Sequence, residues 1–354
     1  MVAPRRSILE RVGARAAKVL GALPAPVQVA LSGGRARVVD GHTLAPDVQL
    51  LLYLDARRGQ ALPTSPEELR AQQRRDAMVV GGRPTPVGGV RDLVVATGGR
   101  ELRARHYAPE QGRGAPLLVF FHGGGFVFGD LDTHDAPCRV LCRHGEMHVL
   151  AIDYRLAPEH PFPAAVEDAL AAVRWAEDHA AELGADPTRV GVGGDSAGAN
   201  LSAVVAQLAR DDGGPRLAGQ VLVYPAVDRT RRYASLELFA EGFILESASI
   251  DWFDRQYKGR SGVHDRDARI GPLHAESLAG LPPALVVTAG FDPLRDEGEA
   301  YAAALAAAGS TAVLRRFDSL VHGFINMVGV SPSCREAVIE IAGAARALLA
   351  AGAG

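Results

Sequence analysis

Cysteine and long apolar runs are both scarce in this sequence. Its 354 residues include three cysteines, Cys138, Cys142 and Cys334. A small, odd number of cysteines argues against a disulfide framework and is typical of a reducing compartment, so we expect a cytoplasmic protein. No stretch reaches the length of an apolar transmembrane helix, and we therefore expect no stable insertion into a membrane.

An excess of charge of one sign is missing as well. The formal net charge is −3, and the arginines are scattered along the chain. This balance gives no reason to expect a nucleic acid as a partner. The N-terminus is basic and partly apolar, but Pro24 and Pro26 interrupt its apolar run, so we expect no signal peptide.

The first 80 residues favour helices. Apolar residues between Ile8 and Leu20 follow helical spacing, which predicts a surface helix that packs on the protein. Loose membrane association of the first 40 residues is the alternative. Two further helices are predicted between residues 45 and 80, the second of them preceded by a capping box at Ser65 and Glu68.

From about residue 81 the pattern changes to strands that alternate with helices. Alternating segments on either side of Gly98-Gly99 predict an antiparallel hairpin. Continuous apolar runs at 116–122 and 148–154 predict strands that are buried on both faces. This order predicts an α/β fold with a mostly parallel central sheet and helices on both faces.

Two helical segments fall outside this alternation. They are residues 1–80 and an insertion at about 228–270 within a unit that spans 81–354. Ligands of α/β sheets bind beyond the carboxyl ends of the strands. We therefore expect both segments to form a helical cap over that edge of the sheet.

The spacing of Cys138, Cys142, His144 and His148 resembles a zinc site. The same residues are also typical of a helix followed by a strand that begins near His148. Two of the four ligands would then lie at or beyond the end of the helix, so we favour the helix and the strand over a metal site.

The stretch GVGGDSAGAN, residues 191–200, has two interpretations. A dinucleotide-binding turn would need its third glycine where Ser196 stands, and no acidic residue ends a following strand at the usual distance. The other interpretation is G-x-S-x-G between a strand and a helix, the pattern of a nucleophile elbow. Gly194 and Gly198 would leave room for the sharp turn, which makes Ser196 the candidate nucleophile.

A serine nucleophile needs a base, which in an elbow-type fold comes last in the chain. Three histidines follow Ser196, and His264 and His274 both precede the strand predicted at 283–290. Only His322 follows a late strand, at a place where a loop can return to the serine. His322 is therefore the predicted base.

The acid that orients this base should stand between the serine and the histidine in the chain. Asp292 follows the strand at 283–290 directly and is the predicted acid, although it is also placed to cap the next helix. Asp296 falls inside that helix, and we expect it to be structural.

The developing oxyanion needs backbone N–H donors close to the substrate. The run His122-Gly123-Gly124-Gly125-Phe126 comes directly after a buried strand, where glycines permit close approach of the backbone. We expect Gly124 and Gly125, together with the N–H of Ala197, to form the oxyanion hole.

Five motifs in one order, HGGGF, DYRLAPEHPFPAAVED, GDSAGAN, DPLRDEG and HGF, resemble the hormone-sensitive-lipase-type (family IV) esterases of the α/β-hydrolase fold. The resemblance covers about residues 85–350. It implies Ser196 as nucleophile, Asp292 as acid and His322 as base, and it implies the same oxyanion hole. No metal and no organic cofactor is implied.

The resemblance also implies residues that support the site without taking part in the chemistry. They are His122, Gly123, Asp195 and the run Asp153-Tyr154-Arg155. The chain departs from the family pattern at Ala199, where a second glycine is common. A methyl group there should leave the triad undisturbed.

The expected activity is hydrolysis of short- to medium-chain acyl esters through an acyl-enzyme, with a small-molecule ester as partner. The acyl site is expected to be lined by apolar residues of the motif loops and the inserted helices: Phe126, Phe128, Leu156, Phe243, Trp252 and Phe324. An amidase or deacetylase would use the same triad, and a non-catalytic binding protein could use the same fold. A homodimer stays open.

Overall fold

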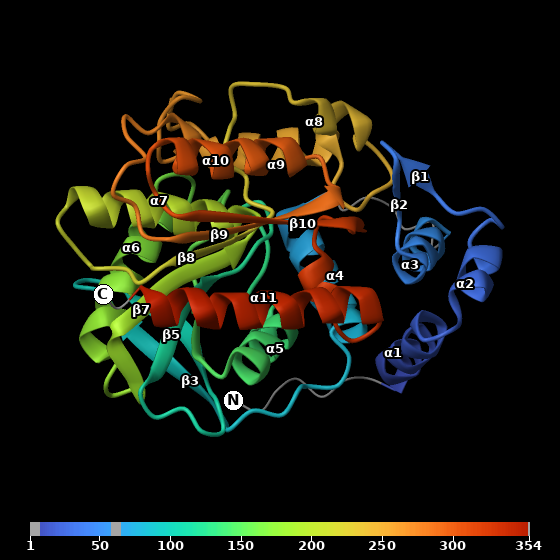
Figure 1. Cartoon of the computed structure of the whole chain (residues 1–354), viewed down its shortest axis with the longest axis horizontal. Coiled ribbons are helices and arrows are strands. Elements are labelled where there is room, and N and C mark those ends of the chain that lie inside the picture. Colours follow the sequence, from blue (N-terminus) through green and yellow to red (C-terminus); the bar gives the residue numbers. More distant parts are fainter. Residues whose placement is uncertain (1–7, 58–64, 353–354) are drawn as a thin grey trace.

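A twisted sheet forms the centre of the protein (Figure 1). The structure is a computed structural model that describes residues 8–57 and 65–352. Within them the sheet has eight strands in the order β10-β9-β8-β7-β5-β6-β4-β3. The strands are β3 (Gly89–Ala96), β4 (Glu101–Ala108), β5 (Ala115–Phe121), β6 (His148–Asp153), β7 (Ala185–Asp195), β8 (Gln220–Val223), β9 (Ala284–Phe291) and β10 (Ala312–Val321).

Most neighbouring strands of this sheet run parallel, as the alternation predicts. The exceptions are the pairs β3–β4 and β4–β6, which are antiparallel. The predicted hairpin around Gly98-Gly99 is therefore confirmed as β3 and β4. The apolar run at 116–122 is confirmed as β5, whose residues are all buried.

Helices cover both faces of the sheet: α5 (Asp135–Gly145) and α11 (Pro332–Ala351) lie on one face, and α6 (Ala164–His179), α7 (Ala197–Asp211) and α10 (Arg295–Ala307) on the other (Figure 1). The alternation of side chains along β5 explains both layers. Leu118 and Phe120 pack in the cluster with α5 and α11, whereas Leu117, Val119 and Phe121 pack in the cluster with α6 and α7. The predicted fold class is confirmed.

Within residues 8–57 and 65–80 the chain forms helices α1 (Ile8–Gly21), α2 (Ala25–Leu31), α3 (Pro46–Ala56) and α4 (Pro66–Val80). The predicted cap of α4 is present, since the hydroxyl oxygen of Ser65 accepts a hydrogen bond from the N–H of Glu68 at 3.2 Å. A two-stranded hairpin, β1 (Val38–Val39) and β2 (His42–Thr43), was not expected. Its turn residues Asp40 and Gly41 have φ of 54° and 75°, which suits an Asp-Gly type I′ turn.

Part of the N-terminal segment packs in the main core. Leu44 and Val48 are buried in the cluster that contains α11. The carboxylate of Asp47 accepts hydrogen bonds from the hydroxyl groups of Ser331 and Ser333 at the start of α11, at 2.7 and 2.9 Å. Residues 44–48 thus tie the N-terminal segment to the last helix.

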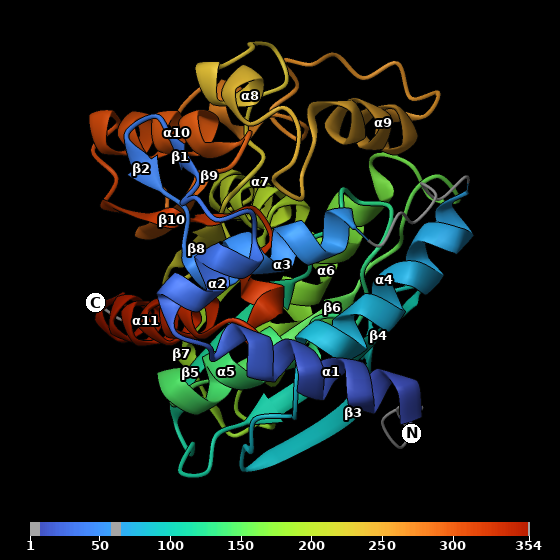
Figure 2. The same ribbon diagram turned by 90° about the vertical axis from the view of Figure 1, so that its right-hand side faces the viewer.

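The inserted segment carries α8 (Ala234–Leu238) and α9 (Ser247–Lys258). Short 3₁₀ helices follow at Pro272–His274 and Phe324–Met327. In Figure 2, α9 and α4 lie at the same end of the molecule, although one belongs to the insertion and the other to the N-terminal segment. Both helices contact the loop that follows β5, α4 through Arg70 and α9 through Phe253.

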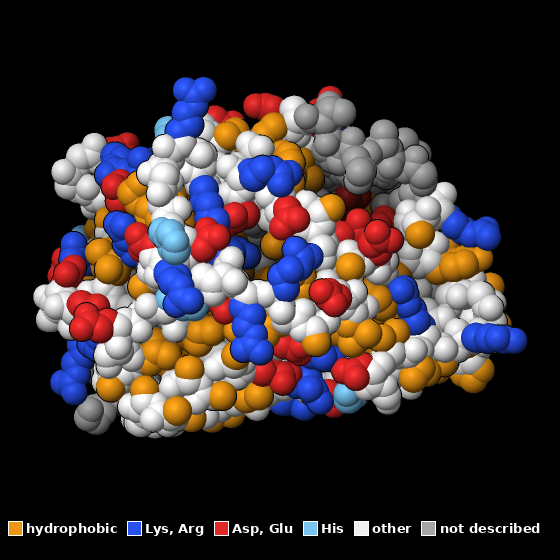
Figure 3. Space-filling model, turned by 90° about the horizontal axis from the view of Figure 1, so that it is seen from above, with side chains coloured by type: hydrophobic (Ala, Val, Ile, Leu, Met, Phe, Trp, Pro, Cys, Tyr) orange, Lys and Arg blue, Asp and Glu red, His pale blue; other side chains and the backbone are white. Residues whose placement is uncertain are grey.

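Positive and negative side chains are intermixed over the face drawn in Figure 3. This agrees with the small net charge of −3. None of the helices within residues 8–57 and 65–352 is long and apolar enough to cross a bilayer. The three cysteines are free and buried.

Candidate active site

Ser196 lies on a sharp turn between the last residue of β7 and the first residue of α7. Its backbone has φ 54° and ψ −115°, a conformation that non-glycine residues rarely adopt. The serine is half-buried. A strained residue at a strand-to-helix turn is the geometry of a nucleophile elbow.

The main chain of the neighbouring strand explains why glycines flank this serine. A Cβ atom at Gly194 or at Gly198 would clash with the carbonyl oxygen of Phe121, the last residue of β5. From the sequence, crowding within the turn itself is the expected reason for both glycines. The structure adds that the turn is pressed against the end of β5, where no side chain fits at either position.

Asp292, His322 and Ser196 come together in one hydrogen-bonded chain. The Nδ1 of His322 lies 2.8 Å from Oδ2 of Asp292, and its Nε2 lies 3.0 Å from Oγ of Ser196. The other carboxylate oxygen of Asp292 accepts a hydrogen bond from the N–H of Leu294 at 2.8 Å, just before α10. The two roles expected to compete for Asp292 therefore use separate oxygens.

Burial holds this chain in place. Asp292 is fully buried, and the imidazole of His322 packs on the ring of Tyr224 with centroids 4.5 Å apart. A carboxylate that is removed from water and bonded to Nδ1 fixes the orientation of the imidazole. The other two histidines that follow Ser196 in the chain have different partners. The Nε2 of His274 lies 2.7 Å from Oδ1 of Asp228, and His264 is exposed and accepts a hydrogen bond from the N–H of Arg266.

Gly123, Gly124 and Gly125 form a tight loop directly after β5. Gly124 and Gly125 have φ of 114° and 58°, which side chains disfavour. The N–H of Gly123 donates to Oδ1 of Asp195 at 2.8 Å. In the described part of the chain, no acceptor takes a hydrogen bond from the N–H of Gly124 or of Gly125, and such open donors are what an oxyanion hole requires.

Behind this loop lies a buried polar cluster. The Nε2 of His134 lies 3.3 Å from Oδ1 of Asp195, and the hydroxyl of Tyr154 donates to the carbonyl of His122 at 2.7 Å. The pKa of Asp195 is lowered, because attraction to His134 and the Gly123 hydrogen bond outweigh the effect of burial. Burial, together with the nearby His134, lowers the pKa of His122 to about 4.

Three of the residues predicted to line the acyl site lie in the core instead. Phe324 is fully buried between Tyr224 and Phe317, and Phe243 is buried against aromatic rings of the core. The ring of Phe126 stacks on Tyr257 with centroids 3.7 Å apart and is also buried. These rings are closed off from solvent, so we withdraw them from the predicted pocket.

The other predicted pocket residues are partly open. Phe128, Leu156 and Trp252 are half-buried. Phe253, on α9 next to Trp252, lies against the oxyanion loop, since a Cβ at Gly125 would clash with its ring. An aromatic side chain of the insertion therefore reaches the loop that carries the candidate N–H donors.

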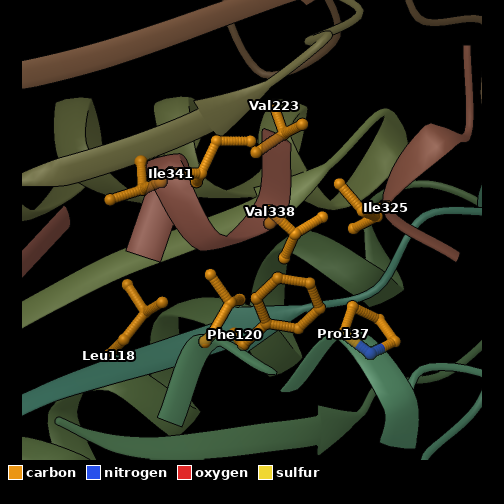
Figure 4. A pocket seen from close by; sticks show the side chains of 10 residues that line it. Leu118, Phe120, Pro137, Val223, Ile325, Val338 and Ile341 are labelled. Atoms are coloured by element: carbon orange, nitrogen blue, oxygen red, sulfur yellow. The ribbon is translucent and has the colours of Figure 1, made fainter. Parts of the chain in front are cut away.

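A small apolar cavity lies beneath the elbow, on the side of the sheet that faces α5 and α11 (Figure 4). Its lining includes Gly194, two residues before Ser196, and it is closed by Phe120, Val223, Ile325 and Val338. The cavity offers no polar group to orient a ligand, so we regard it as a packing void.

The zinc-like pattern is divided between two elements. Cys138, Cys142 and His144 lie on α5, and His148 begins β6, so the predicted helix and strand are confirmed. The Nδ1 of His148 lies 2.9 Å from Nε2 of His106 on β4. The part of the chain that the structure describes holds no group of three or more His, Cys, Asp or Glu side chains placed to bind a metal ion.

Two residues that contact the oxyanion region are not predictable from the sequence. His134 pairs with Asp195, and Arg70 of α4 donates from Nε to the carbonyl oxygen of Val127 at 2.8 Å. Neither residue belongs to a motif of residue types that predicts chemistry. Because these contacts join positions 61 and 57 residues apart, no local pattern could have revealed them.

Comparisons with known proteins agree with this geometry. Residues 118–326 match the family described as alpha/beta hydrolase fold. The chain is 50% identical to carboxylic ester hydrolase LipN of Mycobacterium tuberculosis, over 94% of this chain and 90% of the relative. It is 36% identical to an ethyl acetate hydrolase of Pseudomonas putida, over 84% of this chain and 97% of the relative.

Solved structures of esterases have the same fold. The thermostable carboxylesterase EstE1, cloned from a metagenomic library, superposes with a TM-score of 0.78 at 45% identity, covering 82% of this chain and 99% of its own. An esterase of the archaeon Pyrobaculum calidifontis gives a TM-score of 0.80 at 39% identity, covering 86% of this chain and 98% of its own.

Proposed function

The chain belongs to the α/β-hydrolase fold family, in its hormone-sensitive-lipase-type branch, and from this premise we propose that it is a serine carboxylic ester hydrolase. The observation that carries the proposal is the chain of hydrogen bonds from Asp292 through His322 to Ser196. Esters of small apolar acids are its substrate class, and hydrolysis passes through an acyl-enzyme.

The first half of the reaction transfers the acyl group to Ser196. His322 takes the proton of the hydroxyl group through Nε2, and the oxygen attacks the ester carbonyl. Asp292 keeps the proton on Nδ1 and stabilises the imidazolium that forms. His322 then gives its proton to the leaving alcohol, and water repeats the sequence on the acyl-enzyme.

The negative charge of the tetrahedral intermediate is held by backbone donors. Gly124 and Gly125 supply N–H groups from the loop after β5, and Ala197 supplies one from the first turn of α7. Support comes from the open donors of the two glycines and from the position of Ala197 directly after the nucleophile. The N-terminus of α7 adds its partial positive charge.

Half-buried apolar side chains beside this loop suit a small acyl group. Phe128, Leu156 and Trp252 remain as candidates for the acyl site, and Phe253 joins them through its contact with Gly125. A site bounded by the aromatic residues of α9 favours short- to medium-chain acids over long ones.

We place the enzyme in the cytoplasm and as a homodimer without nucleic-acid partners. Three free, buried cysteines are typical of a protein in a reducing compartment, and a net charge of −3 gives no reason to expect binding to DNA or RNA.

The proposed homodimer forms along an edge of the sheet. Val313 and Leu314 on the edge strand β10 are 53% and 43% exposed, and such an apolar edge favours pairing with a second copy of the chain. Light scattering on wild type and on Val313→Glu tests the dimer.

A series of p-nitrophenyl esters with increasing acyl length tests the function. Wild type should turn over the short esters, and Ser196→Ala should lose about 10⁴-fold or more in kcat. Ser310→Ala is the matched control, because the hydroxyl of this buried serine donates to the carbonyl of Leu278. Equal turnover by Ser196→Ala would refute the enzyme hypothesis, and faster cleavage of matched amides would replace the esterase by an amidase or deacetylase.

A further inference from the structure

Side chains of the N-terminal segment contact the loop that carries the candidate oxyanion donors, and one of them, Arg70, donates to its main chain. Arg70 lies on α4, outside every motif of the catalytic unit, and its side chain is 20% exposed. Its Nε donates to the carbonyl oxygen of Val127 at 2.8 Å, and its Nη2 donates to the carbonyl oxygen of Ala157 at 2.9 Å. Both of these residues are buried.

The orientation of the guanidinium is itself fixed by an acidic partner. Nη1 and Nη2 of Arg70 donate to the two carboxylate oxygens of Glu159 at 2.8 and 2.7 Å. A two-point pair of this kind has a planar geometry that lysine cannot reproduce. Glu159 is 44% exposed, so the ion pair by itself stabilises the fold little.

Val127 is close to the candidate donors along the chain and through its hydrogen bonds. The carbonyl oxygen of Gly124 accepts hydrogen bonds from the N–H groups of Val127 and Phe128, both at 3.0 Å, so residues 124–128 form a single turn. Arg70 holds the carbonyl at the far end of this turn. Movement at Val127 would therefore rotate the peptide units of Gly124 and Gly125.

The same guanidinium also fixes a second support of the turn. The N–H of Ala157 donates to the carbonyl oxygen of Phe126 at 2.9 Å, and Arg70 holds the carbonyl oxygen of Ala157. Phe126 has φ 63°, a conformation that a bulky residue keeps only when its surroundings impose it. One side chain thus bridges two loops at the point where the backbone is strained.

We propose that Arg70 is a positioning residue that aims the N–H groups of the oxyanion loop, and that it makes the N-terminal segment part of the catalytic machinery. This inference rests on the proposed function. Without the guanidinium, the turn at 124–128 relaxes while the triad stays intact. The variant then stabilises the transition state less well, because the oxyanion forms there, whereas its binding of the ester is unchanged.

Three variants test this proposal against a purely structural role. Arg70→Met removes both the positive charge and the planar guanidinium donors, whereas Arg70→Lys keeps the charge alone. Arg75→Met is the matched control at an exposed position of the same helix. For both Arg70 variants we expect kcat on p-nitrophenyl butyrate to fall about ten-fold with KM changed less than about two-fold. The control should keep wild-type values.

Amide hydrogen exchange provides a readout that does not depend on turnover. Peptides that cover residues 122–130 should exchange faster in Arg70→Met than in wild type, whereas peptides around His322 should not change. If the loop exchanges equally in both proteins, or if Arg70→Lys keeps the full kcat, the proposal is wrong. If wild type hydrolyses no ester, the proposed function fails, and exchange in the loop still decides whether Arg70 holds the turn.

Discussion

Two buried aspartate–histidine pairs flank Ser196, and they do different things. In the first pair, Oδ2 of Asp292 lies 2.8 Å from Nδ1 of His322. In the second pair, Oδ1 of Asp195 lies 3.3 Å from Nε2 of His134. All four residues are less than one tenth exposed, so burial alone does not separate a catalytic pair from a supporting one.

The difference lies in what each pair touches next. The free imidazole nitrogen of His322 reaches Oγ of Ser196 at 3.0 Å, whereas the free nitrogen of His134 lies 3.0 Å from the hydroxyl of Thr133. Asp195, in turn, accepts the N–H of Gly123 at 2.8 Å. The first pair thus points at the candidate nucleophile and the second at the main chain, so in the proposed mechanism only the first pair moves a proton.

Breaking the first pair should have the largest effect. Asp292→Asn removes the charge that orients His322, and we expect kcat to fall about 10⁴-fold with KM nearly unchanged. Steady-state kinetics on a p-nitrophenyl ester measures this. A loss below about ten-fold would show that Asp292 does not serve His322 as the acid.

Breaking the second pair at its carboxylate should have a smaller effect. Asp195→Asn weakens the bond to the N–H of Gly123 and the attraction to His134, so the oxyanion loop shifts. We expect kcat to fall about 10²-fold, the size of losing one oxyanion donor. Thermal unfolding distinguishes this loss of kcat from misfolding, because a correctly folded variant still unfolds cooperatively. Full kcat in a folded Asp195→Asn protein would contradict the supporting role.

The sequence could predict the first pair but not the second. Ser196, Asp292 and His322 each follow a strand of one sheet, so strand order and the G-x-S-x-G pattern suffice to predict their meeting. His134 stands in a loop before α5, and its bond to Asp195 spans 61 positions. Their contact depends on β5 lying beside β7 and on the path of the loop between β5 and α5.

Local sequence likewise does not show which of the predicted pocket residues are open to solvent. Phe324 and Phe128 both stand in motif loops and look alike in sequence, but Phe324 is fully buried and Phe128 half-buried. Packing against Tyr224 and Phe317 decides this, and no local pattern encodes it. The β1–β2 hairpin, in contrast, has a local signal in the sequence, the Asp40-Gly41 pair at its turn.

Removing the histidine of the second pair should matter less than removing its aspartate. His134→Gln keeps a hydrogen-bond donor near Asp195 but loses the imidazole, so Asp195 still accepts from the N–H of Gly123. We expect kcat to fall less than about five-fold, with a loss of about 1–3 kcal/mol in the free energy of unfolding. Denaturant unfolding and kinetics measure the two effects. A loss of kcat equal to that of Asp195→Asn would place both residues in one inseparable unit.

Acid should weaken the fold by protonating buried histidines, among them His122, which packs on His134 of the second pair. The pKa of His122 is lowered to about 4 in the folded protein, against 6.5 for its ordinary value. As pH falls below 6.5 the unfolded chain takes up the proton first, so stability declines between pH 6.5 and about 4 and is unaffected above that range. His122 is not alone, because burial also lowers the pKa of His106 to about 4.

Melting temperatures measured between pH 6.5 and about 4 show how far stability declines, and a variant shows how much of the decline comes from His122. His122→Asn should flatten the decline in part, and His264→Asn, at an exposed position, should leave the slope as in wild type. An unchanged slope in His122→Asn would show that His122 is as easily protonated in the folded protein as in the unfolded chain.

Covalent trapping with a p-nitrophenyl alkylphosphonate shows directly whether Ser196 is the nucleophile and whether His322 activates it. The reagent places a tetrahedral phosphorus with a charged oxygen on the residue that attacks it, and peptide mass spectrometry then locates the adduct. We predict one adduct, on the peptide that contains Ser196, formed at least about 10³-fold more slowly in His322→Ala. No adduct, an adduct on another residue, or equal labelling in His322→Ala would contradict the account.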